Sequence, residues 1–230
     1  MLWLRREHGA SMKLFQPILA GATVRDRMIA CLGALLGIGA TALLSRLIVG
    51  ADGPAPLVMA ASMGASSVLL FVVPASPLVQ PWPLVGGHVV SALAGIVVAR
   101  LIPDPMIAAG VAVAAAIALM SLLRCLHPPG GSTALIGVLG GSAVQGAGLM
   151  FALVPIGLNA VLLGLAGFLF HRLSGHAWPH RAVKAKGPAS VTDADIDAAL
   201  ATVGEPLDIS RSDLKAVVKL ALENAAARGR

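Results

Sequence analysis

Two long stretches of the chain carry no charged side chain, and this feature restricts the possible folds more than any other. Asp, Glu, Lys and Arg are all missing from residues 53–99 and again from residues 130–170. Since one bilayer crossing takes about 20 apolar residues, each stretch is long enough for more than one membrane segment. Charged residues form 12% of the chain, against about 25% in ordinary soluble domains. The sequence therefore predicts an all-α, polytopic helical membrane protein.

Prolines and glycines divide the apolar part of the chain into six expected membrane segments. Proline lacks a backbone N–H and breaks helix interiors, so its clusters mark boundaries. The expected segments are residues 28–48, 57–73, 84–102, 106–126, 132–148 and 149–173. Four have the length of full spans, whereas the second and fifth are shorter and interrupted by small residues. These two either cross the bilayer or enter it and return, and we favour six membrane segments.

Basic residues gather on both sides of the membrane part. They are Arg5, Arg6, Lys13, Arg25 and Arg27 before it, and Arg172, Arg181, Lys184 and Lys186 at or after its end. Such flanks predict a multi-pass protein of the cell inner (plasma) membrane with both termini in the cytoplasm. Attraction to anionic lipid headgroups accounts for the net charge of +6 without a nucleic acid partner. No compact apolar core with a small-residue cleavage site opens the chain, so the first segment is expected to be a retained span.

The composition changes again after Pro188, where a polar tail begins. Thr192 precedes three aspartates, as at the capped start of a short helix, and Ser210 with Asp213 resembles a capping box. We therefore expect a small helical hairpin whose second helix ends near residue 226. Its apolar side is expected to pack on the membrane domain or on another subunit. The expected layout is a basic cytoplasmic segment (1–27), a transmembrane domain (28–173), a juxtamembrane linker (174–190) and a soluble helical tail (191–230).

An internal repeat relates the two short segments. The residues Gly64-Ala65-Ser66-Ser67 parallel Gly130-Gly131-Ser132-Thr133, and further on Ala94-Gly95 parallels Ala166-Gly167. The sequence thus predicts two similar halves, each containing a short or broken Gly/Ser-rich segment. If each half holds three crossings, the halves have opposite topology. Transporters built in this way place the substrate between such short segments.

The second short segment follows the sequence Leu126-His127-Pro128-Pro129-Gly130-Gly131, the least ordinary part of the chain. The two prolines end the preceding helix, and the glycines let backbone approach a ligand or another helix closely. Ser132 or Thr133 is expected to cap the helix that follows. A helix start at membrane depth presents N–H groups and a positive dipole end, which suit an anion. From spacing alone, this stretch is either a packing break or a pore-lining site.

Residues 127–135 resemble the hallmark of the HPP family of membrane proteins. The similarity also includes residues 64–71, 76–78, 80–81 and 86–88, Asn159, and Arg172-Leu173, and it extends from about residue 15 to residue 180. The resemblance implies an integral membrane protein whose HPP domain is the membrane part. Chloroplast and cyanobacterial members of this family act in nitrite transport, while most bacterial members have no assigned function.

The residues and the resemblance together favour transport of a small inorganic anion, with nitrite as the leading candidate, by a carrier or a channel. The candidate substrate-binding residues are Arg124, His127, Gly130, Gly131, Ser132, Thr133, Gly64, Ser66, Ser67, His88 and Asn159. Arg124 is the first choice among them, because polar groups within membrane spans usually serve function; its alternative is an arginine that reaches to the membrane surface. A packing hydrogen bond is the alternative for His88, and a bridge between helices for Asn159.

The sequence shows no arrangement that favours catalysis or a cofactor. No Ser-His-Asp, Cys-His or paired-carboxylate pattern occurs, so the chain is not expected to be an enzyme. The spacing of His171, His176 and His180 fits no regular helical face, and we expect no metal there. The expected partners are the lipid bilayer and a small anion, and the many small residues would also suit helix packing in a homo-oligomer. A membrane sensor or scaffold whose C-terminal helices bind a partner is the alternative function.

Overall fold

The computed structural model describes residues 24–50, 59–181, 191–203 and 208–228, and in these residues it contains helices and no strand. The elements are α1 (Val24–Val49), α3 (Ser62–Val72), η1 (Pro77–Val79), α4 (Pro81–Leu101), α5 (Pro105–Leu122), α6 (Pro129–Leu139), α7 (Gly141–Ala147), η2 (Gly148–Ala152), η3 (Leu153–Gly157), α8 (Leu158–Ser174), α9 (Asp193–Val203) and α10 (Arg211–Arg228). The chain is an all-α polytopic membrane protein, as predicted. Most of the expected N-terminal segment and part of the expected linker lie outside the described residues.

Among the described residues, four helical stretches are long and apolar enough to cross a membrane: Val24–Val49, Pro81–Leu101, Pro105–Leu122 and Gly141–Ser174. The other two membrane segments, α3 and α6, are apolar helices of 11 residues each. At 1.5 Å per residue such a helix is about 16 Å long, roughly half the hydrocarbon thickness of a bilayer. The prediction of four long and two short segments is therefore confirmed.

The structure corrects three of the predicted segments. The fifth was expected over residues 132–148, but α6 covers Pro129–Leu139 and a separate helix, α7, covers Gly141–Ala147. The fourth segment was expected to reach residue 126, but α5 ends at Leu122 and the backbone turns at Arg124 with φ of +54°. The last span was expected to be a helix from residue 149, but regular α-helix begins only at Leu158. Val154, the residue before Pro155, has extended dihedrals, because the proline ring clashes with the preceding residue in the helical conformation. The chain there winds through η2 and η3 instead.

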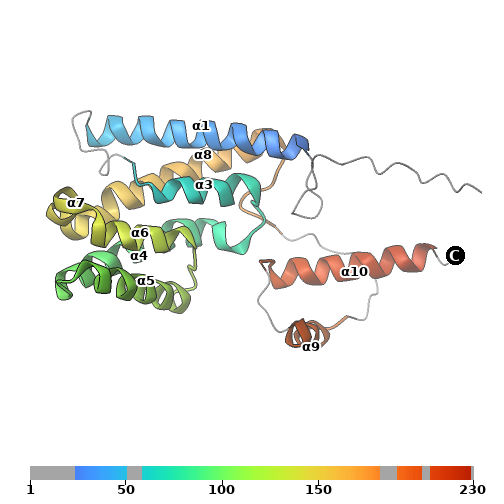
Figure 1. Ribbon diagram of the computed structural model, residues 1–230. Coiled ribbons are helices and arrows are strands. Elements are labelled where there is room, and N and C mark those ends of the chain that lie inside the picture. Colours follow the sequence, from blue (N-terminus) through green and yellow to red (C-terminus); the bar gives the residue numbers. More distant parts are fainter. Residues whose placement is uncertain (1–23, 51–58, 182–190, 204–207, 229–230) are drawn as a thin grey trace, which may run out of the picture.

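The membrane helices form two halves that repeat the order long, short, long. The first half contains α1, α3 and α4, and the second contains α5, α6 and α8. Figure 1 shows that each helix of the first half runs in the opposite direction to its counterpart in the second. Equivalent glycines stand at equivalent crossings, since Gly95 of α4 touches α6 and Gly167 of α8 touches α3. The two similar halves predicted from the repeat are present.

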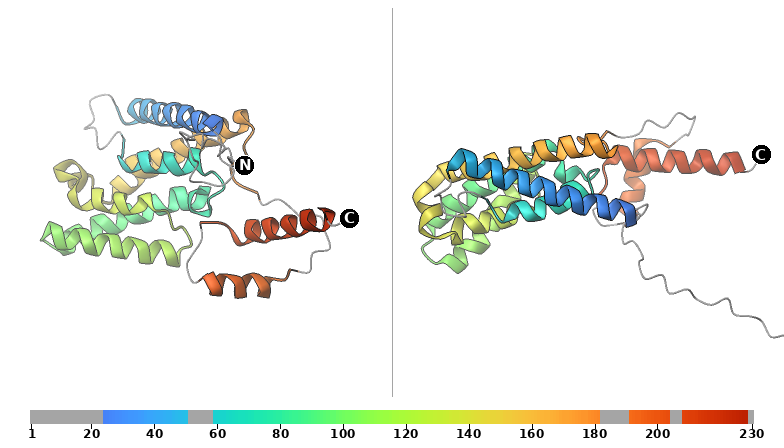
Figure 2. Two further views of the ribbon diagram at one scale, coloured as in Figure 1. Left: turned by 45° about the vertical axis from the view of Figure 1, so that its right-hand side comes forward. Right: turned by 90° about the horizontal axis from the view of Figure 1, so that it is seen from above.

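The two ends of the membrane domain lie at the same end of the bundle. The start of α1 and the end of α8 both lie at the end of the bundle from which the tail extends, and the views of Figure 2 agree. Arg25, Arg27 and Arg172 therefore share one end of the bundle. The short helices α3 and α6 lie side by side in the interior, with α4 on the neighbouring side of α6.

The tail forms the expected helical hairpin, with both of its helices capped. Asp213 donates its backbone N–H to Ser210 Oγ at 3.1 Å, as in a capping box, and Asp195 does the same to Thr192 at 3.3 Å. Two ion pairs join α9 to α10, Arg211–Asp197 and Lys215–Asp193, each at 2.6 Å.

The hairpin attaches to the membrane domain through polar side chains. Ser76 donates to Asp208 at 2.8 Å, and His180 pairs with Asp213 at 2.9 Å. Val217, Leu220 and Leu222 of α10 stay exposed. The apolar side of α10 therefore does not pack on the membrane domain at Val217 and Leu222, and packing of this side on another subunit stays a prediction.

Candidate functional site

A continuous line of hydrogen bonds crosses the interior of the membrane domain, and we call it the buried polar chain. Its members, in order, are the Leu78 carbonyl, His127, Ser66, His88, Thr133 and Ser62. The four central side chains are fully buried, and Ser62 is 2% exposed. Buried polar groups at membrane depth are costly unless they pair with one another, which these side chains do.

Three membrane segments and one loop supply the side chains of the buried polar chain. Ser62 and Ser66 are four residues apart on α3, so both face the same way. His88 lies seven residues into α4, about 10 Å from the start of that helix at 1.5 Å per residue. Thr133 sits one turn into α6, and His127 comes from the segment just before it. The polar groups thus meet where the two short helices approach the long helix α4.

The donor–acceptor distances along the buried polar chain are those of ordinary hydrogen bonds. His127 Nδ1 is 2.7 Å from the Leu78 carbonyl oxygen, and its Nε2 is 2.9 Å from Ser66 Oγ. His88 Nε2 is 2.7 Å from the same hydroxyl, while its Nδ1 is 2.6 Å from Thr133 Oγ1. Thr133 lies 2.8 Å from Ser62 Oγ. A single hydroxyl, that of Ser66, therefore links two imidazoles whose rings are 4.9 Å apart.

Four of the candidate residues belong to the buried polar chain: His127, Thr133, Ser66 and His88. The sequence reasoning missed Ser62 and the Leu78 carbonyl. Ser62 could have been found from its spacing of four to Ser66, which puts both on one helix face. No local signal marks the Leu78 carbonyl, because its contact with His127 joins residues 49 positions apart.

The candidate glycines differ in what surrounds them. A Cβ on Gly130 would lie 2.6 Å from Ser91 Oγ and 3.2 Å from the Gly87 carbonyl, so this glycine lets α6 pack against α4. Gly131 has open space up to 4.0 Å, and Gly64 has no neighbour within 4 Å. Of the other small residues, Ser132 is exposed, and the Ser67 hydroxyl donates to the Gly64 carbonyl of its own helix, at 2.7 Å.

Arg124 and Asn159 lie away from the buried polar chain. The Arg124 side chain is exposed just after α5. Asn159 of α8 is fully buried, donates to Ser45 Oγ at 2.8 Å and accepts from the Ala60 N–H at 3.0 Å. It joins α1, α8 and the residues before α3, which is the bridging role considered for it.

The start of α6 is built differently from the expectation. Pro128 is at the N-cap, and no side chain caps the helix, so the prediction that Ser132 or Thr133 would do so is wrong. The first amides are already used: Gly130 donates to the His127 carbonyl at 2.8 Å and Gly131 to that of Pro128 at 3.0 Å. Because the prolines bring no N–H, the polar donors available near this helix start are hydroxyls and imidazoles.

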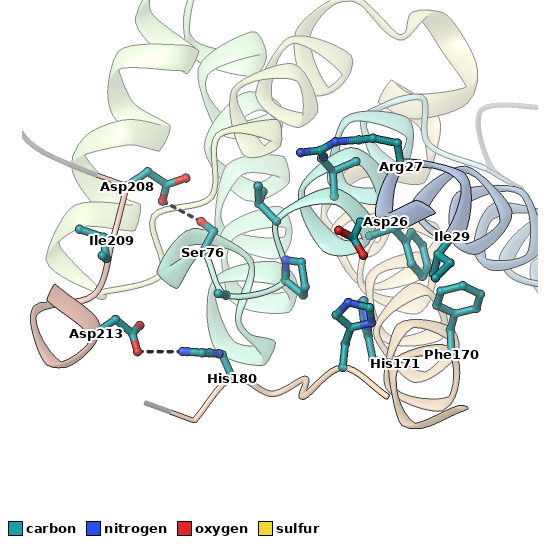
Figure 3. Close-up of a pocket in the computed structure, with 16 residues that line it drawn as sticks. Asp26, Arg27, Ile29, Ser76, Phe170, His171, His180, Asp208, Ile209 and Asp213 are labelled. Carbon is teal, nitrogen blue, oxygen red and sulfur yellow. Dashed lines mark hydrogen bonds and ion pairs between the residues drawn. The ribbon is translucent and has the colours of Figure 1, made fainter. Parts of the chain in front are cut away.

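A pocket of about 650 Å³ opens at the end of the bundle where the hairpin attaches, and we call it the end pocket. It lies among the start of α1, the end of α3, the end of α8 and the residues around Asp208. Figure 3 shows Asp26 and His171 on one side of it, and the Ser76–Asp208 and His180–Asp213 contacts on the other. The described residues contain no group of three His, Cys, Asp or Glu suited to a metal.

In the end pocket, the hydrogen bonds define the proton position on His171 and the direction in which the pKa of Asp213 is shifted. His171 Nε2 is 2.8 Å from the Leu70 carbonyl and donates to it, and within the described residues Nδ1 has no hydrogen-bond partner. Burial raises the pKa of Asp213, but the hydrogen bonds from Ser210 and His180 lower it by more, so the pKa of Asp213 lies below its ordinary value.

A second, apolar pocket of about 520 Å³ lies near the start of α3. Residues 59–61 line it on one side, and Leu135, Ile136, Leu139 and Gly140 of α6 on the other. The end pocket includes Phe71 and Val72 at the opposite end of α3. The short helix that carries Ser62 and Ser66 therefore has a pocket near each of its ends.

The chain matches one protein family model, described as HPP, transmembrane region, over residues 20–179. It is also 37% identical over 121 residues to a transmembrane protein of Dictyostelium discoideum, covering 51% of this chain and 42% of the relative. A second transmembrane protein of that organism is 36% identical over 118 residues, with coverages of 49% and 37%. The matching part thus spans less than half of each relative. No solved structure matches the chain.

Proposed function

Because the chain belongs to the HPP family of membrane proteins, we propose that it transports a small inorganic anion across the membrane, with nitrite as the leading candidate. One observation carries this proposal: the two short helices, α3 and α6, come from halves of opposite direction and meet at the buried polar chain. In transporters with inverted repeats, short or broken helices in corresponding positions surround the substrate.

The pockets at the two ends of α3 support a transport route along this helix. The end pocket and the apolar pocket lie at opposite ends of a helix of 11 residues. The buried polar chain lies between them, with Ser62 and Ser66 on α3 itself. A solute passing from one pocket to the other would travel along α3 and meet these hydroxyls.

The chemistry of the site favours an anion over a cation. Residues 53–99 and 130–170 contain no Asp or Glu, so the central parts of both halves lack a carboxylate. Hydroxyls and imidazoles can donate hydrogen bonds to an anion. We further propose that the protein lies in the cell inner membrane with both termini in the cytoplasm. The basic residues in the first turn of α1 and the last turn of α8, Arg25, Arg27 and Arg172, support this orientation.

Flux into liposomes containing the purified protein tests the proposal, with nitrite, nitrate and chloride as separate solutes. We expect saturable uptake of nitrite. Thr133→Val keeps the shape of the side chain but breaks the buried polar chain, so it should lower nitrite flux about tenfold or more, since an unmade buried hydrogen bond costs about 1–3 kcal/mol.

The matched control is Thr41→Val. Thr41 is equally buried, but within the part of the chain that the structure describes its hydroxyl donates to the Gly37 carbonyl of its own helix, at 2.7 Å. Its variant should transport like the wild type. Absence of flux for all three anions in wild-type liposomes would reject transport of small anions.

A membrane sensor or scaffold is the second candidate function, and the tail supports it. Val217, Leu220 and Leu222 expose apolar surface along α10. If no anion is transported, binding of a protein partner to this surface becomes the leading hypothesis. A cross-linking experiment with a photoreactive group at position 217 in living cells distinguishes the two, because a transporter without a partner should give no specific product.

A further inference from the structure

We infer that the buried polar chain binds one proton together with the transported anion, so that the protein is a proton–anion cotransporter. This inference rests on the proposed function and adds the coupling ion to it. It stands on the number of hydrogen atoms that the chain needs in order to make its contacts.

The hydrogens can be counted from the fixed end of the chain. The Leu78 carbonyl only accepts, so its 2.7 Å contact requires a hydrogen on Nδ1 of His127. In a neutral imidazole the other nitrogen is then bare, and Nε2 of His127 must accept from the Ser66 hydroxyl at 2.9 Å. Ser66 has no second hydrogen, so its 2.7 Å contact with His88 requires a hydrogen on Nε2 of His88. With its hydrogen directed to His127, Ser66 does not donate across the longer 3.3 Å contact to the Ser62 carbonyl.

Thr133 then determines whether His88 is neutral or charged. A neutral His88 with a hydrogen on Nε2 has a bare Nδ1, which must accept the Thr133 hydroxyl hydrogen across 2.6 Å. The same hydrogen is placed to be donated to Ser62 Oγ at 2.8 Å. When Thr133 donates to Ser62, Nδ1 of His88 needs its own hydrogen, and His88 is an imidazolium. In the neutral state the Thr133 hydrogen is used at His88, and the Thr133–Ser62 hydrogen bond is not made. When the Thr133 hydroxyl turns to Ser62 and His88 Nδ1 takes up one proton, both contacts are made.

Ser66 also provides a path for this proton between the two imidazoles. The N–H bond at His88 Nε2 breaks as an O–H bond forms at Ser66, and the former Ser66 hydrogen forms a new N–H bond at His127 Nε2. The charge moves from His88 to His127, and no other bond changes. Lines of protonatable groups inside membrane proteins often serve as proton relays.

No described group around the buried polar chain neutralises the positive charge of a protonated His88 or His127. The elements packed against it face it with hydroxyls or apolar groups, including Ser91 of α4 and Met120 of α5, which contact each other at 3.3 Å. Arg100 and Asp104 lie at the far end of α4 and the start of α5, and Arg124 is exposed. A buried cation without a counter-ion is strongly unfavourable.

A bound anion would remove this penalty, so that each ligand raises the affinity for the other. Such coupling between two binding sites is reciprocal by thermodynamic necessity. One proton and one monovalent anion carry no net charge, so their joint passage does not depend on the membrane potential. We therefore expect electroneutral transport, in which one H⁺ is taken up and released with each anion.

The experiment uses the full-length protein in liposomes that contain a pH-sensitive dye. Nitrite is added outside, nitrite uptake and internal pH are followed together, and the membrane potential is set with potassium and valinomycin. Protein-free liposomes are subtracted, because undissociated nitrous acid crosses lipid unaided. We expect internal acidification of about one proton per nitrite, faster uptake when the external pH is lowered, and no change of rate with the imposed potential.

Ser66→Ala removes the hydroxyl between the imidazoles and should abolish the coupled proton movement. Thr41→Val is the control, since the Thr41 hydroxyl donates to the Gly37 carbonyl of its own helix and lies outside the buried polar chain. The wild-type voltage measurement decides the question even if the Ser66 variant does not fold. Nitrite uptake that follows the imposed potential without acidification would overturn the inference and leave the proposed function standing. No nitrite uptake at all would overturn both.

Discussion

At the scale of single residues, the packing of this membrane domain depends on positions where one backbone touches another. Gly95 of α4 lies directly against the backbone of Ala134 in α6, and Gly137 comes so close that a Cβ on it would be 3.0 Å from Gly95 Cα. Small residues at such crossings are the usual means by which membrane helices pack, because lipid and apolar side chains attract a helix almost equally. The contact holds α6, and with it Thr133, against the helix that carries His88.

Gly95→Ala should therefore destabilise the membrane domain by about 1–3 kcal/mol, the cost of forcing a methyl group into a filled space. The free energy of unfolding in detergent, measured by denaturant titration, checks this. Gly110→Ala in α5 is the matched control, because its Cβ would meet nothing within 4 Å. Equal stabilities for the two variants would contradict the close α4–α6 contact.

At the scale of elements, helix ends are set by side chains that satisfy the first amides. Asp104 accepts hydrogen bonds from Met106 at 2.9 Å and Ile107 at 3.0 Å, and Pro105 follows it as the first helical residue. This combination defines the start of α5. The start of α6 has no such cap, and there the backbone bonds of Gly130 and Gly131 close the first turn instead. The long helix α5 and the short helix α6 thus begin by different local means.

Asp104→Ala should cost about 0.5–2 kcal/mol of unfolding free energy, since it leaves two amides at the start of α5 without their acceptor. Asp104→Asn keeps an acceptor oxygen and should stay close to the wild type. Thermal unfolding of the purified protein measures both. A loss of stability in the asparagine variant as large as that in the alanine variant would show that capping is not the cause.

At the scale of the whole molecule, the hairpin is held to the end of the membrane domain by a few polar contacts. The His180–Asp213 pair and the Ser76–Asp208 hydrogen bond both border the end pocket. Partly exposed pairs of this kind contribute little free energy each. The hairpin therefore has a defined orientation, but little free energy is needed to release it.

His180→Ala should release the hairpin part of the time and raise amide hydrogen exchange in α9 and α10 roughly two- to fivefold, the equivalent of about 0.5–1 kcal/mol. Exchange in α4 and α6 should not change. His176→Ala is the control, because His176 is exposed and contacts only Ser174 at 3.2 Å among side-chain hydrogen bonds of the described residues. Equal exchange in both variants would mean that the His180–Asp213 pair does not hold the hairpin.

The same contact should respond to acid. The pKa of Asp213 is lower in the folded protein than in the unfolded chain, so its ionised form stabilises the attachment above the ordinary aspartate value of about 3.9. That stabilisation is lost as the pH falls through the lowered pKa. Protection of α10 from exchange, corrected for the intrinsic rate, should therefore decrease below about pH 4. The Asp213→Asn variant should lack this decrease.

Local chemistry was sufficient to predict the membrane segments and most of their ends. The uncharged stretches, the prolines and the repeat predicted four long and two short helices, and the capping pattern at Ser210 predicted the start of α10. Hydropathy and capping act within a few residues, so sequence reveals them directly. The exceptions include the fourth segment, which ends at Leu122 instead of residue 126, and the last span, where Pro155 changed the winding of a stretch that hydropathy marks as uniform.

Which polar residues meet was decided only by the tertiary structure. Ser66 joins His127, 61 positions away, to His88, while Arg124, three residues before His127, is exposed at the surface. In a water-soluble protein, the periodicity of apolar residues would have shown which face of each helix is buried. In a membrane, both the lipid-facing and the interior faces are apolar, so the pattern does not distinguish them. The helix crossings at Gly95 and Gly130 fix these faces, and with them the buried polar chain.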